Sequence, residues 1–308
     1  MRIIEGTTEF HIGQKSGVAI GKFDGLHIGH HKLLNRLLEQ KADGLTAVVF
    51  TFDTSAAAFF TNSRVKELTT REEKRRYFEQ LGIDILIEFP LNQETAGIPA
   101  ELFVEKILVE QMRMSYIAAG ADLSFGAGGA GSARLLQQLQ GRYDYQMEMI
   151  DKVQYAGREV SSTYVRQEVE KGDMELAARL LGRAYSMSGT VVTGNQIGRK
   201  LGMPTVNLIP EVDKLLPPLG VYLSKVYREN GVCYNGITNI GYKPTVTSEH
   251  RLGVETYLYD FDQDVYGSRI RVEFLQHRRP EMKFAGLEEL KHQLQLDIAD
   301  GAAYFQIE

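Results

Sequence analysis

The stretch from Val18 to Leu34 constrains this chain most, because an apolar run, a glycine-rich turn and a helical pattern follow one another there. The apolar run ends at Ile20, and leucines at positions 33, 34, 37 and 38 recur at helical spacing. The turn is therefore predicted to lie at the carboxyl end of a strand. In open α/β sheets ligands bind at that edge, and the first backbone N–H groups of the following helix attract anions.

Two glycines and two histidines give this turn its expected chemistry. Gly25 and Gly29 let the backbone approach a phosphate, and His27 and His30 are three residues apart at the start of the helix, so both can face one ligand. Two imidazoles can donate hydrogen bonds to a reacting phosphate without a covalent intermediate. A zinc site would need further ligands at ordered spacing, and the neighbouring sequence offers none. The turn thus predicts nucleotide handling.

Length and charge limit the other possibilities. A chain of 308 residues can form two cores, and a formal net charge of −5 without a Lys/Arg block disfavours nucleic acid as a partner. The single cysteine, Cys233, excludes an intramolecular disulfide and is expected to be a buried small hydrophobe. Neither a signal-peptide pattern nor an apolar run of membrane-spanning length occurs, so we expect a cytoplasmic protein without a membrane partner. Protein partners cannot be read from the sequence.

Strand and helix patterns alternate in the first part of the chain. Predicted strands over 45–52, 83–87 and 115–120 are separated by predicted helices over 71–81 and 99–111, which is typical of a doubly wound parallel sheet. The basic run 74–76 on the first of these helices has the charge to steer phosphates, but it is interpreted as a solvated face, which is the more common role of such a run. Ser161, Ser162 and Thr163 precede another helix; they can cap it, or, with Arg166, bind triphosphate oxygens.

The pattern changes near residue 184. Short strands are predicted over 187–194, 204–209, 220–228, 232–240, 252–260 and 269–276, followed by a helix over 286–299. This indicates a small antiparallel β-barrel with a C-terminal helix. The predicted domains are therefore residues 1–183 and 184–308.

A glycine-rich and basic segment opens the second domain. It suits a flap over phosphates, although glycines also occur at hairpin ends. Thr205 and Asn207 follow it two residues apart on an extended segment, hence on one side, and their oxygens suit Mg²⁺. The candidate nucleotide-binding residues of the flap are Gly189, Gly194, Gly198, Arg199 and Gly202.

The first domain resembles a known family. Residues 21–30 are similar to the nucleotidylyltransferase signature, and Phe23-Asp24-Gly25 resembles the bacterial bifunctional riboflavin kinase/FMN adenylyltransferases, or FAD synthetases. The resemblance implies nucleotide contacts for Gly21, Phe23 and Asp24. Residues 120–126 resemble a family element that lines the nucleotide and flavin site, which implies flavin contacts for Asp122 and Phe125. Residues 161–166 resemble the family's Ser-Ser-Thr-x-Ile-Arg motif.

The second domain continues the resemblance. Residues 198–207 are similar to the riboflavin kinase motif Gly-Arg-x-Leu-Gly-Phe-Pro-Thr-Ala-Asn, and further matches follow in order to residue 297. Glu255 stands at the position of the family's catalytic glutamate, which implies that it accepts the proton of the riboflavin 5′-hydroxyl as this attacks the γ-phosphate. Alternation alone leaves open a surface carboxylate. Asn239 and Arg279 are implied to bind flavin.

The first domain departs from the family in two places. Thr54-Ser55-Ala56-Ala57 replaces the usual Pro-His-Pro, and the loop 127–131 lacks the usual basic residues. Both changes remove positive charge from a site that handles a triphosphate. Each loss is expected to cost about one to three powers of ten in rate.

The resemblance implies a nucleotidylyltransferase domain of doubly wound α/β fold followed by a β-barrel riboflavin kinase domain with a C-terminal helix. The expected function is phosphorylation of riboflavin to FMN with ATP and Mg²⁺, and adenylylation of FMN to FAD with release of pyrophosphate. The departures leave open a kinase whose first domain is degenerate, or a nucleotidylyltransferase for another phosphate-bearing acceptor. A non-catalytic flavin- or nucleotide-binding regulator is the alternative from another class.

Overall fold

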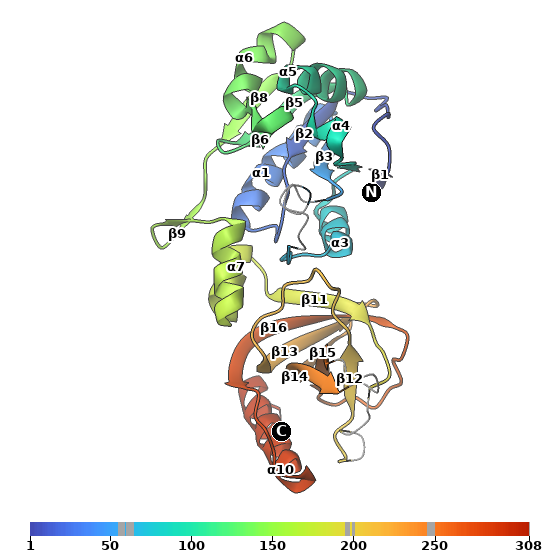
Figure 1. Cartoon of the computed structure of the whole chain (residues 1–308), viewed down its shortest axis with the longest axis vertical. Coiled ribbons are helices and arrows are strands. Elements are labelled where there is room, and N and C mark those ends of the chain that lie inside the picture. The colour runs from blue at the N-terminus through green and yellow to red at the C-terminus, as the bar shows by residue number, and fades with distance from the viewer. Residues whose placement is uncertain (55–58, 60–64, 195–197, 199–200, 245–249, 308) are drawn as a thin grey trace. The chain divides into compact units, whose positions relative to one another are not determined.

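The structure is a computed structural model that describes residues 1–54, 59, 65–194, 198, 201–244 and 250–307 (Figure 1). The contacts within it divide the chain into two compact units, Met1–Ser162 and Thr163–Glu308. This division falls earlier than residue 183, because the helices that precede the barrel group with the second unit. The domain boundary at 183/184 remains a proposal.

The first unit is built on a six-stranded parallel sheet with the order β1-β4-β3-β2-β5-β8. β2 is central, with β3 on one side and β5 on the other. The chain order therefore reverses beside β2, and such a switch point is where parallel sheets bind ligands. The strands are β1 (Arg2–Glu5), β2 (Ser16–Ile20), β3 (Thr46–Phe52), β4 (Ile85–Phe89), β5 (Met114–Gly120) and β8 (Gln146–Ile150).

Helices and short ribbons complete this unit. The α-helices are α1 (Ile28–Glu39), α3 (Arg71–Leu81), α4 (Gln93–Ala96), α5 (Ala100–Leu102) and α6 (Ala133–Tyr143). The remaining helical segments are η1 (Gln40–Asp43), the π-helical η2 (Phe103–Gln111) and η3 (Ala127–Gly129). The short ribbons pair β6 (Ser124–Phe125) with β7 (Gly131–Ser132), and β9 (Gln154–Tyr155) with β10 (Arg158–Glu159).

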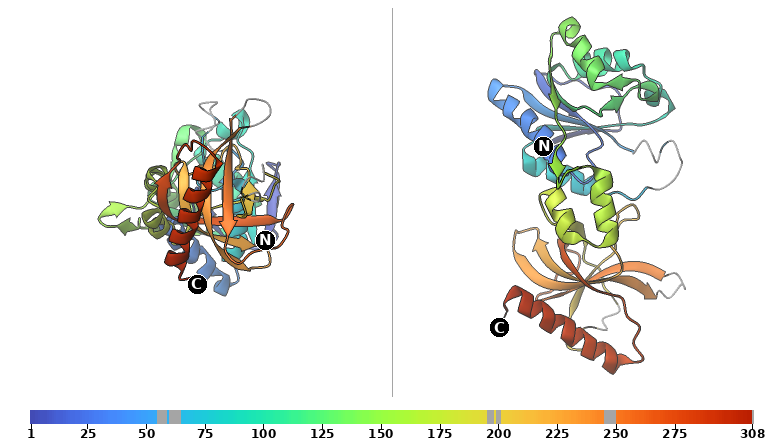
Figure 2. Two further views of the ribbon diagram at one scale, coloured as in Figure 1. Left: turned by 90° about the horizontal axis from the view of Figure 1, so that it is seen from below. Right: turned by 90° about the vertical axis from the view of Figure 1, so that its left-hand side faces the viewer.

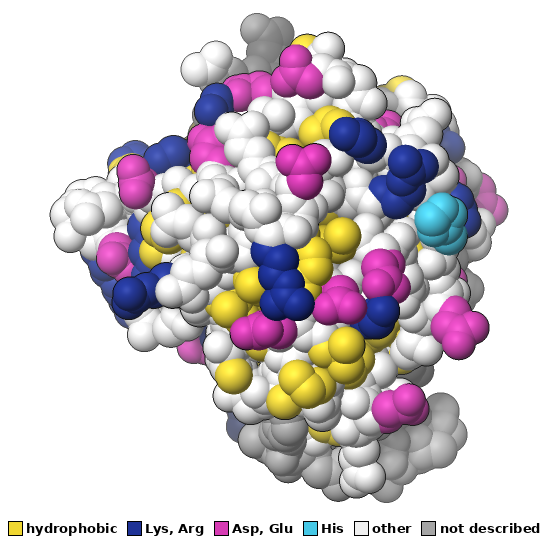
Figure 3. Space-filling view, turned by 90° about the horizontal axis from the view of Figure 1, so that it is seen from above, with side chains coloured by type: hydrophobic (Ala, Val, Ile, Leu, Met, Phe, Trp, Pro, Cys, Tyr) yellow, Lys and Arg dark blue, Asp and Glu magenta, His cyan; other side chains and the backbone are white. Residues whose placement is uncertain are grey.

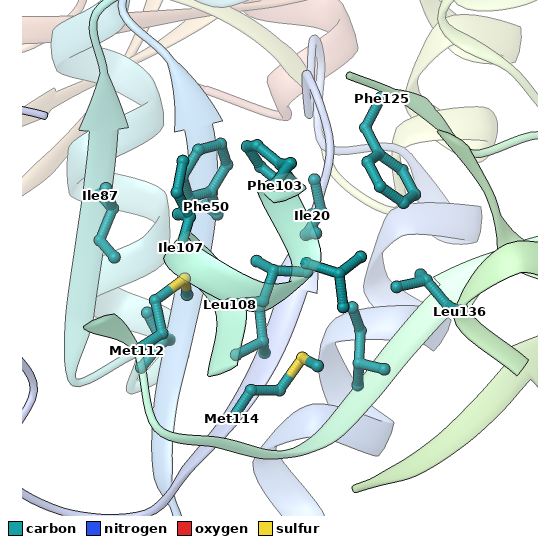
Figure 4. Close-up of a cluster of buried hydrophobic side chains, with 14 of the residues drawn as sticks. Ile20, Phe50, Ile87, Phe103, Ile107, Leu108, Met112, Met114, Phe125 and Leu136 are labelled. Carbon is teal, nitrogen blue, oxygen red and sulfur yellow. The ribbon is translucent and has the colours of Figure 1, made fainter. Parts of the chain in front are cut away.

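Alternate residues of the central strands enter two cores. Val18, Ile20, Val48 and Phe50 pack on one face with η2 and α6, whereas residues 19, 47 and 49 pack on the other with α1 and α3. Figure 4 shows the first core, where the rings of Phe50 and Phe103 lie 5.4 Å apart. Burial on both faces explains the nearly continuous apolar strands and confirms the doubly wound parallel sheet.

Some elements were not predicted. Edge strands β1 and β8 are short and carry exposed polar residues, which hides their strand pattern, and helix α6 also went unpredicted. The predicted helix 99–111 is helical, but most of it is the π-helix η2. In the part of the chain that the structure describes, no helix has the length and hydropathy needed to cross a membrane.

The second unit combines two helices, an antiparallel sheet and a C-terminal helix (Figure 2). Its sheet has the order β11-β16-β13-β14-β15-β12, and a bridge between Val192 and Asn207 joins the chain after β11 back to β12. This bridge links the two edges of the sheet, in agreement with the predicted barrel. The elements are α7 (Ser162–Lys171), α8 (Met174–Leu181), β11 (Tyr185–Thr190), β12 (Thr205–Leu208), β13 (Gly220–Arg228), β14 (Cys233–Pro244), β15 (His250–Leu258), β16 (Arg269–Pro280) and α10 (Leu287–Phe305).

The C-terminal helix α10 lies against the outside of the sheet (Figure 2). Ile237 and Tyr259 pack with its Ile298 and Phe305, and the Tyr259 hydroxyl donates a hydrogen bond of 2.5 Å to the Ile298 carbonyl. Burial of this hydroxyl raises its pKa. The helix continues six residues beyond the predicted end at 299, because its last turns are the ones that pack on the sheet.

Cys233 corrects one expectation. It was predicted to be buried, but its side chain is exposed at the start of β14. The residue follows the turn from β13. At this exposed end of the strand, the alternation of apolar and polar residues does not indicate which side chains are buried. The cysteine therefore does not contribute to the core.

Gly301 allows the close approach of α10 to the sheet, and replacing it should weaken that packing. A Cβ at this position would lie 2.4 Å from both Ile237 Cδ1 and the Tyr259 hydroxyl. Gly301→Ala should therefore lower the free energy of unfolding by about 1–3 kcal/mol, although alanine favours a helix by about 1 kcal/mol. Thermal denaturation measures this change. Gly141→Ala in α6, with nothing within 4 Å, is the control and should be neutral or stabilising; equal behaviour of the two variants would contradict the packing argument.

Candidate active sites

The turn after β2 has a strained backbone held by buried side chains. Phe23 and Leu26 adopt positive φ angles of 51° and 45°, which are unusual for bulky residues. Both side chains are almost completely buried, so packing maintains the conformation. Strain of this kind is concentrated at functional sites, where it orients neighbouring groups.

Asp24 fastens the turn to the segment before α3. Its Oδ1 accepts the backbone N–H groups of Leu68 and Thr69 at 2.8 and 3.2 Å, and the N–H of Gly25 donates to Thr69 Oγ1 at 3.1 Å. Ser162 Oγ donates to the Asp24 carbonyl at 2.8 Å. Asp24, Gly25 and Ser162 were predicted to bind nucleotide, and the structure gives each of them bonds that hold the turn in place.

His27 and His30 lie side by side at the start of α1. Their rings stack with centroids 3.7 Å apart, as the three-residue spacing predicts. His27 Nδ1 accepts the backbone N–H of His30 at 3.3 Å, so a neutral His27 carries its proton on Nε2. A Cβ on Gly29 would lie 3.1 Å from the His27 ring, which explains glycine there. The pair can present N–H donors to one anion.

A cavity of about 200 Å³ lies at the carboxyl edge of the parallel sheet. Residues that follow or end β2, β3, β4 and β5 line it together with the start of α3. Its position is the switch point at which a parallel sheet binds ligands. The lining residues used below are Gly21, Lys22, Asp53, Glu67, Arg71, Lys74, Phe78 and Glu88.

Carboxylates hold most cations around this cavity. Glu88 is 3% exposed and accepts hydrogen bonds from Arg71 Nε at 2.8 Å and Arg75 Nε at 3.0 Å, and Lys74 pairs with Glu67 at 3.3 Å. Burial raises the pKa of Glu88, but the hydrogen bonds from the two guanidinium groups outweigh it and lower that pKa. The interpretation of residues 74–76 as a solvated face is therefore wrong for Lys74 and Arg75.

The remaining residues predicted to bind flavin or nucleotide in the first domain differ in burial and in the unit to which they belong. Phe125 is buried in the core, 5.5 Å from Phe103 (Figure 4), whereas Asp122 is exposed and pairs with Lys152 at 3.4 Å. Their flavin contacts stay predictions. Residues 55–57 of the altered Pro-His-Pro position lie outside the described residues. Thr163 and Arg166 belong to α7 in the second unit, and their nucleotide contacts also stay predictions.

Strand pairing aligns the candidates of the second unit. Glu255 on β15 lies directly opposite Asn207 on β12 and opposite Asn239 on β14. Residues opposite one another in paired strands project to the same face. Ile237 and Tyr257, two residues from this row, pack in the cluster with α10, so the row lies on the outer face of the sheet.

Thr205 extends this row toward a second cavity. Its hydroxyl donates a hydrogen bond of 2.5 Å to Glu255 Oε1, and its neighbour Asn207 is 5% exposed. Both residues line a cavity of about 380 Å³, together with residues 261–266. The predicted placement of Thr205 and Asn207 on one side is confirmed. The arrangement gathers a hydroxyl, a carboxamide and a carboxylate.

The glycines of the flap have separate roles in packing. A Cβ on Gly194 would lie 2.7 Å from the Asn207 carboxamide, and one on Gly198 would lie 2.5 Å from the Met203 carbonyl. Gly189 lies in β11, and Gly202 has a φ of 81° in a turn. Arg199 lies outside the described residues.

Arg279 is fixed by a pair with α10. Its Nε and Nη2 donate to the two carboxylate oxygens of Asp297 at 2.8 and 2.5 Å, and Gln293 donates to the same carboxylate at 2.9 Å. This bidentate geometry positions α10 against β16. A flavin contact for Arg279 stays a prediction.

Sequence reasoning did not identify Glu88 and Lys22 as charged groups of the first cavity. Glu88 offered a signal, because a carboxylate in an otherwise apolar strand is rarely buried without a cationic partner. Lys22 offered none, since its place beside the cavity depends on the turn conformation. In the segment 261–266, Val265 and Tyr266 belong to one of the matches to the riboflavin kinase family, but that match gave no sign that they line a cavity.

Comparisons with known proteins match each half of the chain to a described domain. A family model described as FAD synthetase matches residues 10–164, and one described as riboflavin kinase matches residues 181–305. The protein named bifunctional riboflavin kinase/FMN adenylyltransferase of Listeria monocytogenes is 35% identical over 94% of this chain and 92% of its own. The protein of the same name from Escherichia coli K12 is 33% identical over 99% and 98%.

A solved structure has a similar fold. A chain from Streptococcus pneumoniae, whose title reads macrolide-efflux protein, has a TM-score of 0.83 and 27% identity, and the match covers 96% of this chain and 97% of that one. The similarity extends over both units.

Glu88 should make stability depend on pH. Because its pKa is lower in the folded than in the unfolded chain, the ionised group stabilises the fold above about pH 4.3, and this contribution is lost as the pH falls through the folded pKa. Glu88→Gln should lower the free energy of unfolding by about 1–3 kcal/mol at pH 7 and by less at pH 3. Denaturant titrations at both pH values measure this. Glu72→Gln, on the exposed side of α3, is the control. If Glu88→Gln lowered the free energy of unfolding as much at pH 3 as at pH 7, the lowered pKa of Glu88 would be contradicted.

Proposed function

The chain belongs to the family of bifunctional riboflavin kinase/FMN adenylyltransferases, and we propose that its two sites divide the two reactions between them. The second site phosphorylates riboflavin with ATP to give FMN. The first transfers AMP from ATP to FMN, giving FAD and pyrophosphate. The presence of both matched domains in one chain supports this division over a kinase with a degenerate first domain. We assign residues 1–183 and 184–308 to the two activities.

Glu255 is the proposed base of the kinase reaction. The riboflavin 5′-hydroxyl is a weak nucleophile, and its proton must pass to a nearby acceptor as the oxygen attacks the γ-phosphate. The row of Asn207, Glu255 and Asn239 is the observation that carries this proposal, because it places a carboxylate between two carboxamides on one face. The hydrogen bond from Thr205 orients the carboxylate.

Thr205 and Asn207 are the proposed ligands of Mg²⁺. A hydroxyl and a carboxamide oxygen fit this hard cation, which keeps several waters and binds nucleotide phosphates. When bound, the ion would neutralise charge on the phosphates of ATP. The protein's own contribution is to hold both oxygens at the edge of the 380 Å³ cavity.

His27 and His30 are the proposed phosphate donors of adenylyl transfer. The phosphate of FMN is already an ionised nucleophile, so the reaction needs in-line positioning and charge stabilisation rather than a protein base. The stacked rings and the first N–H groups of α1 support this role. The buried side chains of Phe23 and Leu26 maintain the strained turn that precedes both imidazoles.

The proposed partners are small molecules, and the proposed location is the cytoplasm. On the face drawn in Figure 3, positive and negative side chains are interspersed and no broad basic surface is seen. This distribution, with the net charge of −5, supports flavins and ATP as ligands rather than nucleic acid.

Replacing the proposed base should separate the two activities. Glu255→Gln keeps the shape of the side chain but cannot accept the proton, so FMN formation from riboflavin should fall about 10²- to 10⁴-fold. FAD formation from supplied FMN should be unchanged. Chromatographic separation of the flavins measures both rates in one preparation. Glu229→Gln, exposed after β13, is the matched control; a normal rate of FMN formation in Glu255→Gln would rule out this base.

Gly194 should be required for the position of Asn207. In Gly194→Ala the new Cβ would meet the carboxamide at 2.7 Å and displace it. FMN formation should fall about ten- to hundredfold, while FAD formation from FMN stays at its original rate. The same flavin assay applies. Gly286→Ala, whose Cβ meets nothing within 4 Å, should leave both rates intact; equal rates in Gly194→Ala and Gly286→Ala would count against the argument.

A further inference from the structure

The charges around the first cavity are unevenly paired. Among its described lining residues, the cations are Lys22, Arg71 and Lys74, and the carboxylates are Asp53, Glu67 and Glu88. Arg71 pairs with Glu88 and Glu5, and Lys74 pairs with Glu67. The positive charge of Arg71 and Lys74 is thus already compensated by the protein.

Lys22 differs from these two cations. Its side chain is exposed, and within the described ranges no carboxylate lies at ion-pair distance from its amine. Residues 55–58 and 60–64, which belong to the same unit, contain neither Asp nor Glu. Lys22 therefore lines the cavity with its charge available to a ligand.

The strained turn connects Lys22 to the histidine pair. The ring of the next residue, Phe23, packs on Gly21, where a Cβ would lie 3.1 Å from Phe23 Cζ. The same ring lies 5.6 Å from Phe78, which lines the cavity, and 5.2 Å from His30. One buried aromatic side chain thus touches the cavity wall on one side and the proposed phosphate donors on the other.

We propose that Lys22 binds phosphate oxygens of the substrates during adenylyl transfer and supplies the uncompensated positive charge of this cavity. Because Arg71 and Lys74 are already paired with carboxylates, an ATP or FMN phosphate would meet little attraction from them, and it needs a cation that can turn toward it. An exposed ammonium on a flexible stem suits this role as a point charge. The proposal rests on the adenylyl-transfer function of the first domain.

Kinetics of FAD formation from FMN and ATP test the role of Lys22. Lys22→Ala should lower kcat/KM about ten- to hundredfold, mainly through a higher KM for the phosphate-bearing substrates, and Lys22→Arg should restore most of it. FMN formation from riboflavin in the same chain should be unchanged. Lys15→Ala is the matched control, because Lys15 precedes β2 at the opposite edge of the sheet and should have no effect. A kcat/KM within twofold of the original chain in Lys22→Ala would overturn the proposal.

Calorimetric titration with FAD separates this proposal from the function on which it rests. Binding needs no turnover, and Lys22→Ala should weaken FAD binding about tenfold relative to Lys15→Ala. Equal FAD affinity in the two variants would overturn the role of Lys22. Failure of the original chain to form FAD from FMN would instead contradict the adenylyl-transfer function, while the difference in FAD affinity would still support Lys22 as a phosphate-binding residue.

Discussion

Asn207, Glu255 and Asn239 meet because β12, β15 and β14 pair in one register, and the buried residues beside them keep that register. Thr238 and Thr256 lie opposite one another on the inner face, where their hydroxyls are 2.8 Å apart. A slip by one residue would turn Glu255 into this interior and expose the threonines. The cost of burying an unpaired carboxylate therefore protects the arrangement of the site.

In the first unit, a parallel sheet and a strained turn position the residues of the candidate site. Parallel pairing brings the ends of β2, β3, β4 and β5 to one edge, and the carboxylate of Asp24 fastens the turn to the start of α3. The buried rings of Phe23 and Phe78 then hold the turn from beneath. Asp24, Gly25 and Ser162, which the sequence predicts to bind nucleotide, form hydrogen bonds that hold the turn in place.

The sequence predicted the features that depend on local periodicity. The strand, turn and helix around His27, the shared side of Thr205 and Asn207, and the change from alternating helices to short strands all follow from side-chain spacing. The face of Glu255 could not be predicted, because it depends on which strands become neighbours. The pairing of Arg279 with Asp297, the buried role of Asp24 and the exposure of Cys233 likewise depend on tertiary contacts.

The central claim is that one chain carries both reactions despite the lack of a histidine and a basic loop in its first domain. The most direct measurement is a time course of flavins separated after mixing the unmodified chain with riboflavin and MgATP, with a parallel reaction begun from FMN. We expect FMN first and FAD later in the first reaction, and FAD without delay in the second. Accumulation of FMN with no FAD in either reaction would contradict the claim.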